Sequence, residues 1–260
     1  RICSMLQLKS YQDQICDQNK QLEQRVKERT FELELSHREI IYRLAKAGEF
    51  RDEETGYHIK RVGLYSCLLA QRLGMDDLFC DLIQLTSPLH DIGKIGIPDE
   101  ILHKPGTLSE DERKTMQTHC RIGVSILRTD SPFVSADGNS GLLEAGENEK
   151  NSLLEMAATI ALSHHERWDG SGYPEGRTGR SIPLAARIVA LADVYDSLRS
   201  TRPYKVEYSA RKSRGIIKNN SGKHFDPQIV AVFREVHEEM DMIFSECRQS
   251  TRETGKEAGQ

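Results

Sequence analysis

The sequence is organised around residues 164–174, which read His164-His165-Glu166-Arg167-Trp168-Asp169-Gly170-Ser171-Gly172-Tyr173-Pro174. Two adjacent imidazoles end an apolar run and are followed by the only tryptophan of the chain and a glycine-rich turn. Adjacent histidines can act as metal ligands, and glycines let the backbone approach another group closely. A helix that ends in a glycine-rich turn would give the same pattern, so the stretch alone leaves both interpretations open.

Length and composition indicate one sizeable domain with an appendage, because the chain has 260 residues of which 37% are hydrophobic. The net charge of −4 argues against nucleic acid as a partner. Six scattered cysteines without a C-x-x-C pair predict reduced thiols and no zinc ribbon. No apolar run is long enough to cross a bilayer, and the initial Arg suggests a segment of a longer protein.

Residues 5–40 form a polar segment without Gly or Pro that carries apolar residues at heptad spacing. Seven of its eleven a and d positions are apolar, and Asn19 at an a position favours a parallel two-stranded pair. We expect a linker or coiled-coil helix over residues 1–40, with a homodimer as one use of it. A solvated connecting helix fits the same pattern.

A carboxylate and an imidazole come next at helical spacing. Glu54 precedes His58 by four residues, which on a helix places both side chains on one face. Such a pair can hold a metal or form a surface ion pair, and by itself it favours the surface pair. Val62, Tyr65 and Leu69 then follow at helical intervals and indicate a face turned to the core.

His90 and Asp91 lie in apolar surroundings, in the sequence Pro88-Leu89-His90-Asp91-Ile92-Gly93-Lys94. An ionised carboxylate is costly to bury without a partner. A divalent cation would supply that partner, and the doublet can offer two ligands to one metal or one ligand to each of two.

Three further groups fall on predicted apolar helical faces. His119 lies on a helix opened by the S-x-x-E capping box at Ser109, although a lone inward His is more often a hydrogen-bonded core residue. His164 continues the face of an apolar helix, and Asp193 takes an apolar position in a helix that starts at Pro183. An Arg pair or a helix cap would compensate Asp193 as well as a metal would.

Together these groups favour one shared explanation. Five of the nine histidines, with three carboxylates, lie in or beside apolar helical segments, where unpaired charge is costly. Two or three divalent metals held by nitrogen and oxygen ligands from several helices would satisfy all of them. Ligands without thiolate favour Fe or Mn over a structural zinc, and paired metals are a common device for phosphate-ester hydrolysis.

Five motifs in this order resemble the HD-GYP family of phosphodiesterases, a branch of the HD phosphohydrolase superfamily. They are Arg51-Asp52-Glu53-Glu54-Thr55-Gly56-Tyr57-His58, His90-Asp91-Ile92-Gly93-Lys94, Thr118-His119, the 164–174 stretch with Gly172-Tyr173-Pro174, and Asp193 with Arg202-Pro203-Tyr204-Lys205. The resemblance implies an all-α fold, an HD-superfamily helical bundle preceded by a long linker helix. It also implies hydrolysis of the bacterial second messenger cyclic di-GMP to pGpG or GMP.

The resemblance also implies roles for individual residues. The metal ligands would be Glu54, His58, His90, Asp91, His119, His164, His165 and Asp193. The catalytic residues would be Asp91, bridging two ions, and Lys94, supporting the phosphate. The substrate contacts would be Lys94, Gly172, Tyr173, Pro174, Arg202 and Lys205. Glu54 resembles the mark of a third metal, so we expect three ions rather than two.

We predict three parts: a helix at 1–40, the HD-GYP domain at 41–245 with a flexible acidic insertion at 130–151, and a disordered tail at 246–260. The N-terminal helix resembles the connector between a receiver domain and an HD-GYP output domain. We therefore expect a response-regulator parent in the bacterial cytoplasm, with an upstream receiver or sensor domain and other signalling proteins as further partners.

Other functions fit parts of the sequence. An HD hydrolase for another nucleotide would share the metals, but Tyr173 with Arg202 and Lys205 argues against it. A catalytically silent receptor or protein-interaction module would be marked by lost ligands, and every expected ligand is present. A nucleic-acid-binding module fits least, because of the acidic balance.

Overall fold

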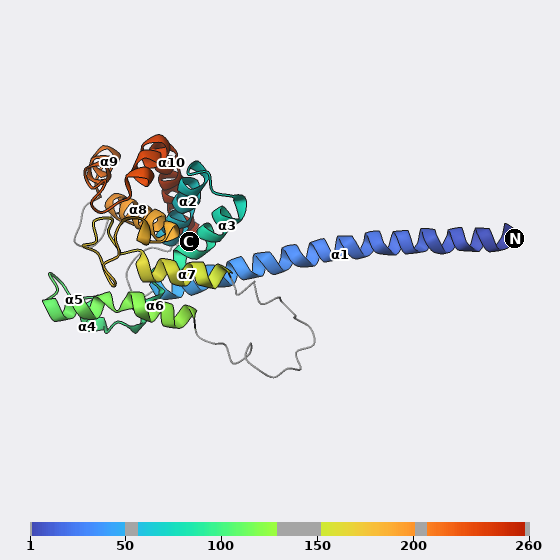
Figure 1. Cartoon of the computed structure of the whole chain (residues 1–260), viewed down its shortest axis with the longest axis horizontal. Helices are drawn as coiled ribbons and strands as arrows, with labels where there is room; N and C mark the ends of the chain where they lie inside the picture. The colour runs from blue at the N-terminus through green and yellow to red at the C-terminus, as the bar shows by residue number, and fades with distance from the viewer. Residues whose placement is uncertain (1, 50–56, 129–151, 201–206, 258–260) are drawn as a thin grey trace. The chain divides into compact units, whose positions relative to one another are not determined.

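The computed structural model describes residues 2–49, 57–128, 152–200 and 207–257 (Figure 1). Three predicted site residues, Glu54, Arg202 and Lys205, lie outside the described residues, as does the whole predicted insertion at 130–151.

Helices make up the described part of the chain, and the only β feature there is an isolated bridge between Ser221 and Phe225. The predicted all-α fold class is confirmed. The α-helices are α1 (Ile2–Glu49), α2 (Tyr57–Arg72), α3 (Asp77–Thr86), α4 (Asp99–Leu102), α5 (Glu110–Gln117), α6 (His119–Leu127), α7 (Ser152–Ser163), α8 (Leu184–Arg199), α9 (Ala210–Asn219) and α10 (Pro227–Glu257). The short 3-10 helices are η1 (Ser87–Leu89), η2 (Ile92–Gly96) and η3 (Gly179–Ser181).

The chain divides into two units, Arg1–Ile41 and Tyr42–Gln260, one residue from the boundary predicted after residue 40. Helix α1 forms the first unit and contributes its last turns to the second. In the first unit the predicted seam residues Leu22, Val26 and Leu33 are between 58% and 63% exposed. An apolar seam of this kind is what a coiled-coil partner would cover, and dimerisation stays a prediction.

Side-chain caps fix the starts of α5 and α10, and the first of them is the cap predicted at Ser109. The capping box at Ser109 is formed, since its hydroxyl accepts from the backbone N–H of Glu112 and the Glu112 carboxylate accepts from the backbone N–H of Ser109. At the start of α10, the Asp226 carboxylate accepts from the backbone N–H of Gln228 at 2.8 Å.

The predicted single helix through Met116 and His119 is instead two helices, α5 and α6, that meet at Thr118. The Thr118 hydroxyl donates to the carbonyl oxygen of Thr115 at 2.6 Å. A side chain that bonds the backbone in this way competes with a continuous helical ladder. As a consequence, His119 is the first residue of α6.

Helix α8 is the centre of the second unit and packs against α2, α7, α9 and α10. Ten of its residues are buried, on all sides, as expected for a helix that lies inside a domain. The surrounding core includes Val62, Tyr65, Leu69, Ile83, Ile160, Ile188, Leu191, Tyr195, Ile217, Phe225, Ile229, Phe233 and Val236. Because α8 is central, its two aspartates, Asp193 and Asp196, are held inside the domain.

Helix α10 continues past residue 246, where the sequence analysis placed the start of a disordered tail. Residues 246–254 contain neither Gly nor Pro and are rich in Glu, Gln and Arg, which are good helix formers. The polar residues that suggested disorder after residue 246 instead belong to the end of α10, which runs to Glu257.

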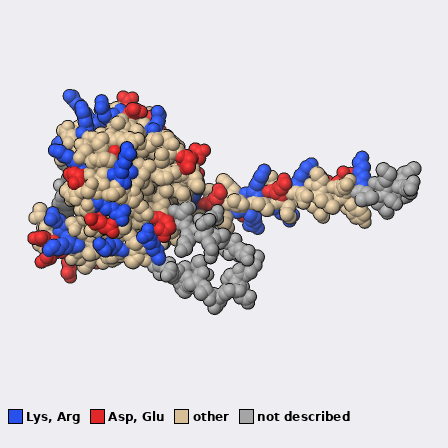
Figure 2. Space-filling view, viewed as in Figure 1, with Lys and Arg blue, Asp and Glu red and all other residues tan. Residues whose placement is uncertain are grey.

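Figure 2 shows Lys and Arg interspersed with Asp and Glu over much of the visible face of the second unit. This mixture differs from the basic stripe typical of nucleic-acid-binding proteins. In the described residues, no helix is long and apolar enough to span a membrane.

Candidate metal centre

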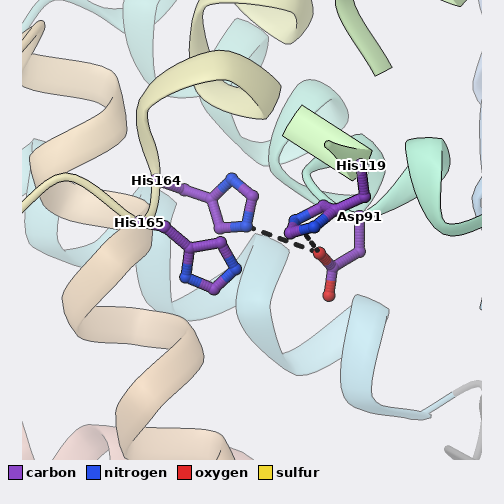
Figure 3. Close-up of side chains that lie close together, drawn as sticks. All are labelled: Asp91, His119, His164 and His165. Carbon is purple, nitrogen blue, oxygen red and sulfur yellow. Dashed lines mark ion pairs between the residues drawn. The ribbon is translucent and has the colours of Figure 1, made fainter. Parts of the chain in front are cut away.

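Seven of the eight predicted metal ligands form two groups in the second unit, each with ligand atoms within 4.8 Å of one another. They come from helix ends and from the central helix α8. The first group is Asp91, His119, His164 and His165, and the second is His58, His90 and Asp193. Figure 3 shows the first group converging, with His119 and His164 directed at the Asp91 carboxylate.

Asp91 lies between the two groups, in the short connection from η1 to η2. Its Oδ1 is 3.3 Å from Nε2 of His119 and 3.4 Å from Nε2 of His164. Its Oδ2 is 3.3 Å from Nε2 of His90 and 2.8 Å from Nζ of Lys94. One carboxylate oxygen thus faces each group, which is the arrangement that a ligand bridging two ions requires.

The second group is built around Nε2 of His58, near the start of α2. This nitrogen lies 3.6 Å from Oδ1 of Asp193, and Nε2 of His90 lies 4.0 Å from the same oxygen. Oε1 of Glu49, at the end of α1, is 3.7 Å from the same nitrogen of His58. Glu49 is buried, and it was not among the predicted ligands. The available signal was a carboxylate one helical turn after the buried residue Ala45.

Backbone carbonyl groups orient three of the histidine rings, on the side of each ring that faces away from the centre. His90, His119 and His164 each place Nδ1 against a carbonyl oxygen of their own turn, at 2.7 to 3.1 Å. A carbonyl only accepts, so Nδ1 carries the proton and Nε2 presents its lone pair to the centre.

Several of the atoms that face the centre are buried without a hydrogen bond within the described residues. These atoms are Nε2 of His90, Nε2 of His164 and Oδ1 of Asp91. Buried polar atoms are normally satisfied, so a group of them on converging imidazoles and a carboxylate fits metal coordination.

The electrostatics of the first group follow from burial and from Asp91. Burial would raise the pKa of Asp91, but Lys94 and His90 hold this pKa well below its ordinary value. Burial and His164 hold the pKa of His165 well below its ordinary value. Burial opposes protonation of His119, but its contact with Asp91 raises the pKa to about 10. A metal in this group would compete with the proton that Asp91 favours on Nε2 of His119.

The 164–174 stretch forms one wall of the first group. The Tyr173 ring stacks on His165, with ring centroids 4.7 Å apart. A Cβ at Gly172 would lie 2.3 Å from the backbone nitrogen of Arg167, so only glycine fits. Pro174 follows Tyr173 through a cis peptide bond. The predicted substrate contacts Gly172, Tyr173 and Pro174 are thus adjacent to the metal ligands, as is Lys94.

The rest of the stretch is fixed by hydrogen bonds that the sequence analysis did not foresee. Glu166 is buried, and its carboxylate accepts from the backbone N–H groups of Glu175 at 2.8 Å and Arg177 at 3.0 Å. The backbone N–H of Trp168 donates to the carbonyl oxygen of His224 at 3.1 Å. These contacts hold the turn in place beside the centre.

Arg199, a basic residue just before the predicted substrate contacts Arg202 and Lys205, has a structural role. Arg199 pairs with Asp241 on α10 and donates to the hydroxyl of Tyr195 at 3.1 Å. It is therefore committed to joining α8 to α10. Its predicted neighbours Arg202 and Lys205 lie outside the described residues.

His224 gives the 164–174 turn a predicted sensitivity to acid. Burial, with a smaller effect of Arg167, lowers the pKa of His224 to about 4, while Asp193 and Asp169 oppose the shift. An unfolded histidine titrates at about 6.5. A depressed pKa in the folded state means that its stabilising contribution is present above pH 6.5 and is lost as the pH falls from 6.5 to 4.

We expect metal-free wild-type protein to lose stability over this range more steeply than His224→Phe. Phenylalanine keeps the ring stacked on Phe225, 4.2 Å away between centroids, and removes the titrating group. Urea unfolding of both proteins in chelator at several pH values measures the difference. If the free energies of unfolding of the two proteins depend on pH in the same way, His224 does not take up a proton on unfolding between pH 6.5 and 4.

Comparison with known proteins places the chain in a family. Residues 15–229 match the family described as HD domain. The chain is 42% identical over 241 residues to a probable cyclic di-GMP phosphodiesterase of Vibrio cholerae, covering 90% of this chain and 52% of the relative. It is 36% identical over 255 residues to the cyclic di-GMP phosphodiesterase response regulator RpfG of Xanthomonas campestris, covering 98% and 62%.

A 3'3'-cGAMP-specific phosphodiesterase 2 of Vibrio cholerae is 40% identical over 212 residues, covering 82% of this chain and 37% of the relative. The chain spans about half the length of the curated relatives it matches. The crystal structure of the cyclic GMP-AMP phosphodiesterase V-cGAP3 of Vibrio cholerae has the same fold, with a TM-score of 0.56 at 22% identity, covering 81% of this chain and 50% of that chain. The resemblance to the HD phosphohydrolases is confirmed, and the chain belongs to the HD domain family.

Proposed function

We propose that this chain is an HD-GYP phosphodiesterase domain that hydrolyses cyclic di-GMP to pGpG or GMP with the help of divalent metals. The observation that carries the proposal is the Asp91 carboxylate, with one oxygen facing each of two buried ligand groups. The substrate is inferred from the relatives that are named as cyclic di-GMP phosphodiesterases.

The chain's own residues suit a phosphodiester substrate. His58, His90 and Asp193 would hold one ion and His119, His164 and His165 another, with Asp91 shared between them. When bound, such ions activate water and stabilise charge on the phosphate. Lys94, 2.8 Å from Asp91 and largely buried, brings a positive charge to the edge where the phosphate would lie. Tyr173 presents an aromatic ring beside His165 that suits a purine base.

The metal is proposed to be Fe or Mn, because both groups consist of imidazole and carboxylate ligands. Glu54, from which a third ion was predicted, lies outside the described residues, but Glu49 adds a second carboxylate beside His58. Three ions therefore stay part of the proposal alongside two.

The signalling context is also a proposal. Nearly the whole of this chain aligns with only 62% of a relative named as a response regulator, and this supports a receiver or sensor domain upstream in the parent protein. The exposed apolar seam of α1 supports a homodimer, and other signalling proteins are further partners. A second messenger made and degraded inside the cell would place the domain in the bacterial cytoplasm.

The test is turnover by protein purified without oxygen and analysed for bound metal. We expect bound transition metal and release of pGpG or GMP from cyclic di-GMP, detected by chromatography. Because three relatives are named as 3'3'-cGAMP-specific, that nucleotide and linear pGpG belong in the same assay. Faster turnover of 3'3'-cGAMP would move the assignment to that substrate. Binding of cyclic di-GMP without hydrolysis in metal-replete protein would favour a silent receptor.

A further inference from the structure

The ligand imidazoles differ in the group that holds them from behind. His90, His119 and His164 use backbone carbonyls of their own turns. His58 instead places Nδ1 at 2.8 Å from Oδ2 of Asp196, which is 138 positions away in the sequence. A carboxylate behind a metal-binding imidazole is a stronger acceptor than a carbonyl, because it carries a full negative charge.

Asp196 is fully buried on α8 and is held by more than His58. Nε of Arg61 donates to its Oδ1 at 2.5 Å, and a second guanidinium nitrogen of Arg61 donates to Oδ2 at 2.8 Å. The Ser200 hydroxyl lies 3.3 Å from Oδ2. This two-point pairing balances the charge of the carboxylate and fixes its plane, so the direction in which it meets His58 is also fixed.

Arg61 is itself clamped by the C-terminal helix. Its guanidinium lies 5.1 Å from the centroid of the Phe244 ring on α10, and its side chain is only 7% exposed. Arg61 is three residues after His58 on α2, so it and His58 share one face of that helix. The contacts that run from Phe244 through Arg61 and Asp196 to His58 therefore link three helices, α10, α2 and α8, behind the metal centre.

We propose that Asp196 is a positioning residue of the metal centre, which holds His58 with Nδ1 protonated and Nε2 directed at Asp193 and His90. This inference rests on metal binding in the proposed function. Without Asp196 the His58 ring is free to rotate or to present the other nitrogen, and the second group loses a correctly aligned ligand. Removing such an outer carboxylate typically weakens metal binding about 10–100-fold.

The test compares Asp196→Asn with Asp226→Asn. Asp226 also forms a buried ion pair with an arginine, Arg187, but contacts none of the predicted ligands, so it controls for loss of a buried pair. Mn²⁺ is titrated into each metal-free protein in competition with a chelator, and thermal unfolding is measured in parallel. We expect one ion to bind about 10–100-fold more weakly in Asp196→Asn and both affinities to be kept in Asp226→Asn.

If both variants bind Mn²⁺ as tightly as the wild type, Asp196 has only a structural role as the partner of Arg61. That result would overturn this inference alone. A wild-type protein that binds no metal would instead overturn the proposed function. A second measurement needs no variant to fold: nitrogen NMR of the Zn²⁺-loaded wild type should show His58 with a proton on Nδ1 and the metal on Nε2. Coordination through Nδ1 would overturn the positioning role.

Discussion

Asp91→Ala is expected to abolish cyclic di-GMP hydrolysis, with kcat/KM lower by on the order of 10³-fold or more, and to lose bound metal. The physical reason is the placement of its two oxygens, one toward His119 and His164 and the other toward His90 and Lys94. Because its neighbours keep the pKa well below the ordinary value, the carboxylate is ionised at every pH used for assay. Alanine removes the carboxylate that faces both groups, so each group would lose the charged ligand proposed for it.

The measurement is turnover together with metal content of the same purified sample. Asp111→Ala is a suitable control, because its side chain is 97% exposed and lies on α5, which contributes no ligand. The control should match wild type in both readouts. Substantial activity in metal-replete Asp91→Ala would show that the two groups do not share this carboxylate in the reaction.

The candidate ligands could be predicted from sequence because they are polar side chains in otherwise apolar helical segments. A single aspartate or histidine in an apolar helical segment can have a structural partner, but the pattern repeats at His90, Asp91, His164 and Asp193, and one shared metal centre explains all of them. The same reasoning predicted the helices that carry them. It failed at Thr118, where a side-chain hydrogen bond to the backbone divides a helix that apolar periodicity makes continuous.

The groups behind the ligands could not be predicted, because their partners are distant in sequence. Asp196 follows Asp193 on the same helical face, yet nothing in the sequence says that it meets His58 and Arg61 on α2. Glu49 is the last residue of α1 and His58 lies in α2, so helical spacing does not relate the two side chains. Contacts of this kind are fixed by the packing of α2 on α8, which is a property of the whole core.

The close packing around Gly93 gives the second large expected effect, which is on stability. Gly93 lies two residues after Asp91, and η2 packs there directly on the start of α6. A Cβ at Gly93 would lie 1.9 Å from the carbonyl oxygen of His119 and 2.5 Å from the backbone nitrogen of Gly123. Gly93→Ala therefore has to force η2 and α6 apart. We expect a loss of about 3 kcal/mol or more in the free energy of unfolding.

Separation of η2 from α6 also moves Asp91 away from His119, so Gly93→Ala should lose metal affinity together with stability. Gly215→Ala is the matched control, since it adds the same methyl group in the middle of α9, where a Cβ would meet nothing within 4 Å. There alanine should stabilise the protein by about 1 kcal/mol, because it favours helix over the unfolded chain. Denaturant unfolding measures both, and opposite signs are the expected result. A Gly93→Ala protein as stable as wild type would mean that η2 and α6 do not approach this closely, and the arrangement of Asp91 against His119 would have to be revised with it.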